Sequence, residues 1–132
     1  MLNIRKIQAI APIVADLAAS AHFYRDGLGV PLHGDPDSYL FTEEVPGLNH
    51  FGLWRLADAA RSCWKSETWP SDLPRPQLCV EFDVDDVASA MADLEAAGCQ
   101  PLQPPETQEE WGTTVVRYLS PEGLVIVVGH TP

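Results

Sequence analysis

Two chemically competent side chains, Cys79 and Glu81, alternate with apolar residues along one short segment. Successive side chains of an extended strand point to opposite faces, so Cys79 and Glu81 share one face, and the other face carries Leu78, Val80 and Phe82. If that apolar face packs against a helix, the thiol and the carboxylate face a cleft. A carboxylate in such a cleft can bind a cation or, when burial raises its pKa, act as a general base. A salt bridge to Arg117 is the structural alternative for Glu81.

Aromatic and imidazole side chains are the other candidates for a binding site. Trp54 could stack a planar ligand from a cleft wall or pack in the core, and the sequence leaves open which face of the sheet it occupies. Trp64 and Trp69 could close over a cleft, anchor a dimer, or cluster beneath their loop. His50 is a lone imidazole, which is more often a hydrogen-bonded or surface side chain than a catalyst. Trp111 is expected to be structural.

An internal repeat indicates the elements that position these residues. The segments VADLAASAHFYRDGLGVPL and VDDVASAMADLEAAGCQPL begin at Val14 and Val84, so the offset between them is 70 residues. A repeat of this size indicates two copies of one supersecondary unit. Each position in one copy can therefore be compared with the position 70 residues away in the other.

Each copy is predicted to run strand, helix, strand, strand, strand. Asp16 caps the first helix and Asp85 or Asp86 the second, while glycines end both. The first copy is expected to have strands over 4–14, near 30–33, near 39–43 and over 48–56. The second is expected to have them over 77–83, 100–103, 113–119 and 124–128. The long connection between the copies contains prolines and two tryptophans.

This order predicts an α+β fold of two βαβββ modules. The first module is placed at 1–57, the connection at 58–75 and the second module at 76–132. Together they are expected to make one domain, and the protein is expected to be a homodimer with exchanged or facing modules.

Charge and composition restrict the partners. The chain has 8 Lys and Arg against 19 Asp and Glu, a formal net charge of −11. Such a surface repels nucleic-acid phosphates and anionic membranes but leaves room for a cationic ligand.

No apolar run is long enough to span a bilayer, and the start of the chain lacks the pattern of a signal peptide, so a cytoplasmic location is expected. Three cysteines without metal-type spacing are expected to be reduced thiols.

The phrases VADLAASAHFYRDGLG, after the first expected strand, and WGTTVVRYLSPEG, before the last, complete a pattern that resembles the vicinal oxygen chelate superfamily. This group includes glyoxalase I, extradiol dioxygenases, fosfomycin-resistance enzymes, methylmalonyl-CoA epimerase and bleomycin-binding resistance proteins. The resemblance covers nearly the whole chain. It implies two curved sheets that form an open cleft, with the helices outside. It does not specify a reaction, because the superfamily hosts several on one scaffold.

In the enzymes of this superfamily, a divalent metal is held by His, Glu or similar residues from the first and last strands of each unit. The resemblance places the first-strand ligands at Ala9 and Cys79 and one last-strand ligand at Val127. The fourth falls within 50–54, where only His50 could bind a metal. Alanine and valine cannot ligate, and a lone thiolate is a poor ligand for Mg, Mn or Fe. We therefore expect no metal centre of the family type.

The chain thus resembles the metal-free, bleomycin-resistance-like branch of the superfamily. This implies a protein without cofactor that sequesters a planar or cationic organic molecule, such as an antibiotic, and catalyses no reaction. The expected ligand-binding residues are Trp54, His50, Glu81, Cys79, Trp64, Trp69 and Arg117. The alternative is a lyase, isomerase or dioxygenase of the same superfamily that uses Glu81 as a base or a rearranged metal site.

Overall fold

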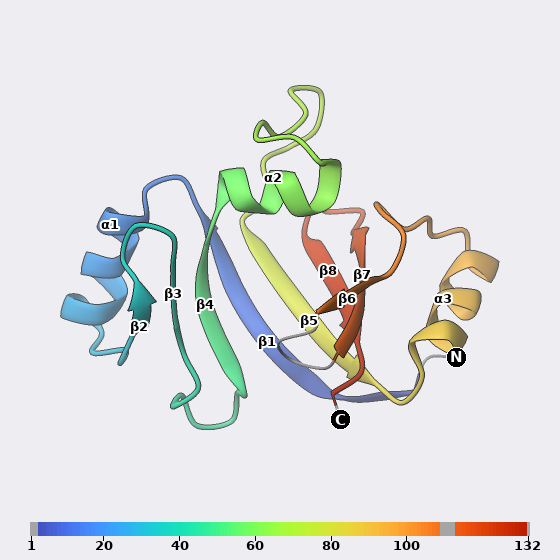
Figure 1. Ribbon diagram of the computed structural model, residues 1–132, viewed down its shortest axis with the longest axis horizontal. Helices are drawn as coiled ribbons and strands as arrows, with labels where there is room; N and C mark the ends of the chain where they lie inside the picture. Colours follow the sequence, from blue (N-terminus) through green and yellow to red (C-terminus); the bar gives the residue numbers. More distant parts are fainter. Residues whose placement is uncertain (1–2, 109–112, 132) are drawn as a thin grey trace.

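The strands form one curved, eight-stranded sheet in the computed structural model, which describes residues 3–108 and 113–131 (Figure 1). Across the sheet the order is β2-β3-β4-β1-β5-β8-β7-β6. The strands are β1 (Ile4–Val14), β2 (His33–Asp35), β3 (Tyr39–Thr42), β4 (His50–Arg55), β5 (Leu78–Val84), β6 (Glu106–Gln108), β7 (Thr113–Leu119) and β8 (Val125–Gly129). The predicted α+β fold with two βαβββ units is confirmed.

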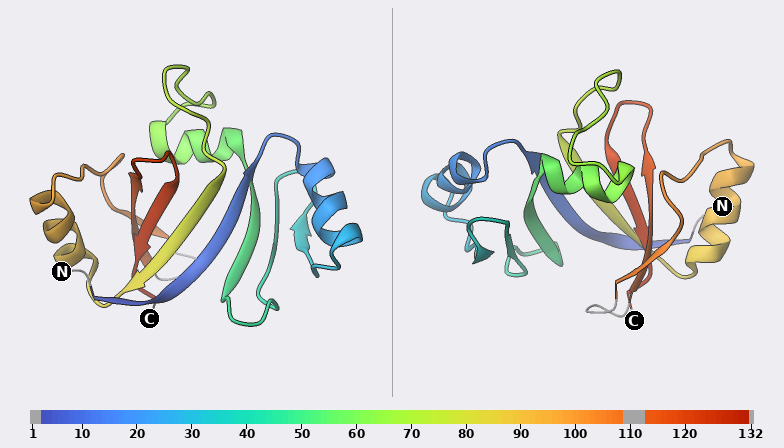
Figure 2. Two further views of the ribbon diagram at one scale, coloured as in Figure 1. Left: turned by 180° about the vertical axis from the view of Figure 1, so that it is seen from behind. Right: turned by 45° about the horizontal axis from the view of Figure 1, so that its top comes forward.

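Helices pack on both faces of this sheet. At opposite ends lie α3 (Val87–Ala96) and α1 (Leu17–Ala21), which continues into a π-helical segment, η1 (His22–Gly27) (Figure 2). The other face is covered in part by α2 (Leu56–Trp64), which crosses the top of the sheet in Figure 1. Among residues 3–108 and 113–131, no helix combines the length and apolar character that crossing a bilayer requires.

Three apolar clusters hold these helices in place. Leu17 of α1 packs with Leu40 and Leu53, while Ala90 of α3 packs with Val84, Val116, Tyr118 and Val128. On the opposite face, α2 packs its buried residues against Ala11, Cys79 and Val125. The alternation along β5 therefore turns Val84 toward a helix and leaves Cys79 and Glu81 on the face that α2 covers only in part.

The internal repeat is visible in the register of the two central strands. β1 and β5 run antiparallel, with Ala9 opposite Glu81 and Ala11 opposite Cys79. An offset of 70 residues converts one of these pairs into the other. Each central strand then pairs in parallel with the last strand of its own unit, β4 or β8. The sheet thus has an approximate two-fold axis between β1 and β5.

Two short strands begin later in the chain than predicted. β2 begins at His33 instead of near residue 30, and β6 begins at Glu106 instead of residue 100. Pro31 and Pro101 lie in the predicted segments, and proline has no N–H group to donate to a neighbouring strand. Such residues are restricted to strand edges and starts, and here both strands form only after them.

The helix α2 was not predicted, because the connection was interpreted from its prolines. Those prolines begin only at Pro70, and the segment before them, LADAARSCW, has good helix formers and a buried face of Ala59, Ala60 and Cys63. The predicted strand over 48–56 correspondingly ends at Arg55.

Two aspartates at equivalent positions cap helices, and each should contribute measurably to stability. Asp16 accepts a hydrogen bond from the Ala19 amide at 3.0 Å, and Asp86 accepts one from the Ser89 amide at 3.2 Å. We expect Asp16→Ala and Asp86→Ala each to lower the free energy of unfolding by about 0.5–2 kcal/mol, measured by urea denaturation. Serine at either position retains an acceptor and should restore most of the loss. Equal losses for alanine and serine would contradict a capping role.

Candidate functional site

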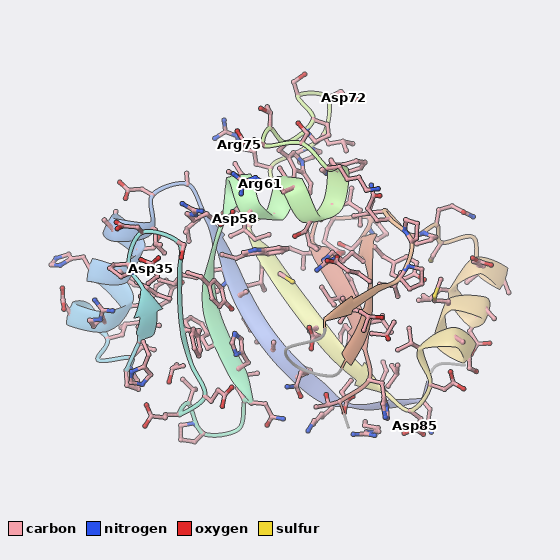
Figure 3. The ribbon with its side chains drawn as sticks, viewed as in Figure 1. Asp35, Asp58, Arg61, Asp72, Arg75 and Asp85 are labelled. Atoms are coloured by element: carbon pink, nitrogen blue, oxygen red, sulfur yellow. The ribbon has the colours of Figure 1, made fainter. Side chains whose placement is uncertain are left out.

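A cleft of about 860 Å³ lies on the concave face of the sheet, bounded on one side by α2. Residues from both repeat units line it, so the cleft spans the approximate two-fold axis. Its lining includes Gln8, Ala9, Tyr39, Glu43, His50, Trp54, Arg55, Asp58, Cys79, Glu81, Arg117 and Val127. Figure 3 shows Asp58 and Arg61 on α2 at the edge of this region, with Asp72 and Arg75 farther out on the following loop.

The floor of the cleft contains one continuous row of residues across five strands. His50 pairs with Ala9, Ala9 with Glu81, Glu81 with Val127, and Val127 with Arg117. Residues in direct register project to the same face of a sheet. The structure therefore brings three of the predicted site residues, His50, Glu81 and Arg117, onto one surface.

Glu81 is a carboxylate without a partner in this row. Within residues 3–108 and 113–131 it forms neither a hydrogen bond nor an ion pair. Burial raises the pKa of Glu81, and the nearby carboxylate of Asp83 raises it further, while the positive charge of Arg117 opposes both effects. The cleft thus holds a partly desolvated acid that no cation of the described residues contacts at hydrogen-bond distance.

Tyr39 and His50 of the first unit form an aromatic wall of the cleft, and Phe41 stacks beside them. Tyr39, Phe41 and His50 lie nearly parallel, with ring centroids 5.3–5.9 Å apart and interplanar angles of 10–16°. The Tyr39 hydroxyl lies 2.5 Å from His50 Nε2, and burial raises the pKa of Tyr39 and lowers the pKa of His50. Desolvation therefore favours the neutral forms of both groups. Sequence reasoning missed Tyr39, although its alternation with Leu40 in a predicted strand could have indicated it.

Gly52 makes this wall possible. It pairs with Phe41, and a Cβ atom added to it would lie 2.5 Å from Tyr39 Cζ and 2.9 Å from Cε1. Atoms do not approach so closely without displacement, so the ring of Tyr39 occupies the space that any side chain at position 52 would take.

Arg117 and Cys79 form the opposite side of the cleft. Arg117 is buried, with 8% of its surface exposed, and its Nη1 donates to Glu106 Oε2 at 2.9 Å. The ion pair that the sequence left open, between Glu81 and Arg117, is absent from the described residues. Burial raises the pKa of Cys79 to about 12, so its thiol is protonated at neutral pH and is a weak nucleophile and metal ligand.

The predicted tryptophans separate into two locations. Trp54 lines the cleft next to Tyr39, with which it pairs across β3 and β4. Trp64 and Trp69 instead contact each other edge to face, with ring centroids 5.7 Å apart, and Trp69 Nε1 donates to the Pro74 carbonyl. Neither is part of the cleft lining. Trp111 lies outside the described residues.

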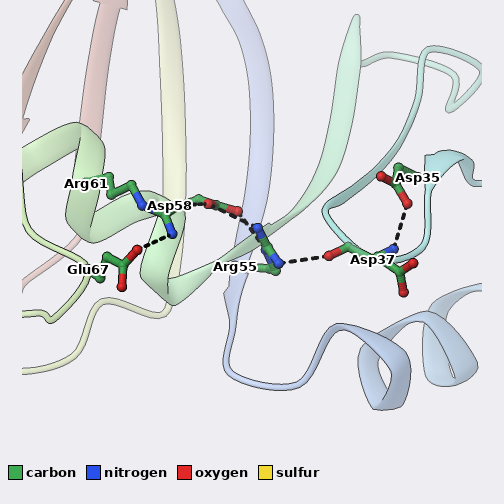
Figure 4. Close-up of polar contacts among 6 residues, drawn as sticks. All are labelled: Asp35, Asp37, Arg55, Asp58, Arg61 and Glu67. Atoms are coloured by element: carbon green, nitrogen blue, oxygen red, sulfur yellow. Dashed lines mark hydrogen bonds and ion pairs between the residues drawn. The ribbon is translucent and has the colours of Figure 1, made fainter.

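A chain of ion pairs ties α2 to the rim of the cleft (Figure 4). Arg55 donates to both carboxylate oxygens of Asp58, at 2.7 and 3.2 Å, and to the carbonyl of Asp37 at 2.8 Å. Arg61 extends the chain to Asp58 and Glu67. These contacts join the β2–β3 turn, the end of β4 and α2, and they hold the helix that bounds the cleft.

The positions at which the resemblance implies metal ligands are nearly devoid of donors. Ala9 pairs with His50 as Cys79 pairs with Val125, so the first-unit counterpart of Val127 is two residues past His50, at Gly52. Alanine, glycine and valine offer no donor at three of the four positions. Among the described residues, no group of three His, Cys, Asp or Glu side chains is arranged to hold a metal ion. The residues therefore do not fit a metal centre of the family type.

Comparisons with known proteins agree with this architecture. A family model described as Glyoxalase/Bleomycin resistance protein/Dioxygenase superfamily matches residues 6–128. The uncharacterized protein YraH of Bacillus subtilis (strain 168) is 24% identical over 126 residues, which cover 93% of this chain and 96% of YraH.

Solved structures show the same fold at low sequence identity. One is a glyoxalase/bleomycin resistance protein/dioxygenase superfamily member from Vibrio splendidus 12B01, with a TM-score of 0.63, 14% identity, and 98% and 99% of the two chains covered. Another is methylmalonyl-CoA epimerase from Streptomyces coelicolor, with a TM-score of 0.56, 15% identity, and 99% of each chain covered. At these identities the structures establish the fold alone.

Proposed function

Because the chain belongs to the glyoxalase/bleomycin resistance protein/dioxygenase superfamily, we propose that its cleft binds a planar, cationic organic molecule without using a metal ion. The outcome is sequestration of the molecule, as in the antibiotic-binding members that the sequence resembles. Homodimerisation and a cytoplasmic location remain predictions from the sequence.

This proposal rests on the environment of Glu81. This residue is an acid on the cleft floor with neither hydrogen bond nor ion pair to the described residues, and burial raises its pKa. A ligand cation would restore the favourable interaction that desolvation removes from the carboxylate. Such a contact in a partly buried site is stronger than the same contact in water.

The charges and rings around Glu81 support a planar cation. Arg55 is already paired with Asp58, and Arg117 with Glu106, whereas Glu43 adds a further carboxylate to the lining. The parallel rings of the first unit offer a flat surface for stacking, and Trp54 extends it. Aromatic faces attract cations by about 0.5–2 kcal/mol, depending on desolvation.

The test is a titration of dialysed protein, followed by tryptophan fluorescence, with proflavine and bleomycin as cations and naphthalenesulfonate as a planar anion. We expect saturable binding of the cations in the presence of EDTA, and binding of the anion at least about tenfold weaker. Failure of both cations to bind, or binding that requires an added divalent metal, would refute the proposal.

A second candidate function rests on the same carboxylate. A raised pKa makes Glu81 a stronger base than an ordinary glutamate, which suits proton abstraction in a lyase or isomerase. The two functions differ in the fate of the ligand. A ligand that is only sequestered is recovered unchanged after incubation with the protein in D₂O. Proton abstraction would instead exchange one of its carbon-bound hydrogens for deuterium, which mass spectrometry detects.

A further inference from the structure

The two halves of the cleft differ in chemistry although they are built from equivalent strands. Phe41 pairs with Gly52, and Arg117 pairs with Val127, so the repeat makes Phe41 and Arg117 counterparts. In the same way Glu81 of the second unit corresponds to Ala11 of the first. At these counterpart positions the first unit has an aromatic ring and a methyl group, and the second has one charge of each sign.

Arg117 has donor capacity that the protein itself does not use. Its ion pair with Glu106 engages only Nη1. Nε, on the other edge of the guanidinium, is buried and has no hydrogen-bond partner among the described residues. The edge formed by Nε and Nη2 matches the two oxygens of a carboxylate, and a buried donor without an acceptor is costly. This edge belongs to a side chain that lines the cleft and is more than nine-tenths buried.

Glu106 does not remove the need for a second acceptor. Its side chain is 60% exposed, while that of Arg117 is 9% exposed, so the ion pair lies at the outer end of the arginine. The positive charge of Arg117 also reaches Glu81 and Cys79, both of which line the cleft. An acceptor supplied from the cleft side would complete the coordination of Arg117.

We propose that the cleft selects a zwitterionic aromatic ligand, with its ammonium group at Glu81, its carboxylate at Arg117 and its ring on the wall formed by Tyr39 and His50. This inference rests on the proposed function and adds an anionic group to the ligand class. Only Val127 separates the two charged residues in the row, so their backbones are about 10 Å apart. The two charges of the ligand must therefore be several bonds apart, as in an aromatic dipeptide and unlike a single amino acid.

Three probes that differ in one charge each test the inference by isothermal titration calorimetry. They are naphthylalanylglycine, its C-terminal amide, which lacks the anion, and its N-acetyl derivative, which lacks the cation. In the wild-type protein we expect the dipeptide to bind about tenfold or more tightly than the amide, because a bidentate contact to arginine is charge-assisted. The N-acetyl derivative should bind most weakly, since its carboxylate lacks the ammonium partner for Glu81.

Variants of Arg117 test whether this residue causes the preference for the dipeptide over its amide. Arg117→Met should bind the dipeptide and the amide equally, and Arg117→Lys, which keeps the charge without the planar fork, should retain only part of the preference. Glu106→Gln is the matched control, because it removes the negative charge that pairs with Nη1 and leaves the free edge of Nε and Nη2 in place. It should retain the full preference.

The results separate the two proposals. Equal affinities of dipeptide and amide in the wild-type protein, or an undiminished preference in both Arg117 variants, would overturn the zwitterion inference while leaving cation binding intact. Failure of the dipeptide, the amide and proflavine alike would overturn the proposed function and the inference with it.

Discussion

Replacing Glu81 with glutamine is expected to weaken the binding of planar cations by about 10- to 100-fold. Glutamine preserves the size of the side chain and one acceptor oxygen, but it removes the charge and replaces the other oxygen with an NH₂ donor. The loss is large because Glu81 lies in the row at the floor of the cleft, where the carboxylate is partly desolvated and has no competing cation at hydrogen-bond distance. Fluorescence titration with proflavine measures it directly.

Glu43 provides the matched control for this variant. It also lines the cleft, but its residue surface is exposed, so water and salt screen its charge. We expect Glu43→Gln to change the affinity by no more than about threefold. Equal losses in the two variants would show that the cation senses the net charge of the molecule and has no specific site at Glu81.

The pH dependence of this binding follows from the protonation of Glu81. Only the ionised carboxylate attracts a cation, so affinity should fall as pH decreases through the raised pKa of Glu81. The stability of the free protein should change in the opposite direction. A raised folded-state pKa means that the native state binds more protons than the unfolded chain, so stability decreases as pH rises from the ordinary glutamate value through the folded value. Glu81→Gln should remove the contribution of Glu81 to both dependences and be the more stable protein at neutral pH.

The sequence was sufficient to predict the scaffold because its signals were periodic and local. The caps Asp16 and Asp86 and the alternation along β5 depend on residues close together in the chain, and the 70-residue repeat is found by comparing two segments directly. The same alternation placed Glu81 and Cys79 on one face before any partner strand was known. The row that joins His50, Glu81 and Arg117 depends on the register of five strands, which alternation within a single strand does not reveal.

Other parts of the site depend on tertiary packing, which leaves no periodic pattern in the sequence. The separation of Trp54 from Trp64 and Trp69 follows from the helix α2, whose formation places Trp64 and Trp69 beside each other and away from the cleft. The unused edge of Arg117 depends on which acceptor reaches the arginine. The sequence does not reveal that Glu106, on the neighbouring strand β6, pairs with only one end of the Arg117 guanidinium.

Gly52 is the position at which a single methyl group should most disturb the structure of the cleft. The added Cβ of Gly52→Ala would lie 2.5 Å from Tyr39 Cζ and closer still to the hydroxyl oxygen, so the ring must leave its place. Tyr39 is constrained by stacking on Phe41 and His50 and by its contact with His50 Nε2, which makes displacement costly. We expect Gly52→Ala to lower the free energy of unfolding by about 1–3 kcal/mol, the usual range for overpacking.

A double-mutant cycle distinguishes this steric effect from a general cost of altering β4. Tyr39→Ala removes the ring that the new methyl group would meet, so Gly52→Ala should be nearly neutral in that background. A coupling energy of about 1 kcal/mol or more between the two sites, measured by urea denaturation, is therefore expected. Additive effects would mean that Gly52 is needed by the strand itself and not by the ring. Coupling would instead mean that the absence of a side chain at position 52 makes room for the ring of Tyr39 in the cleft wall.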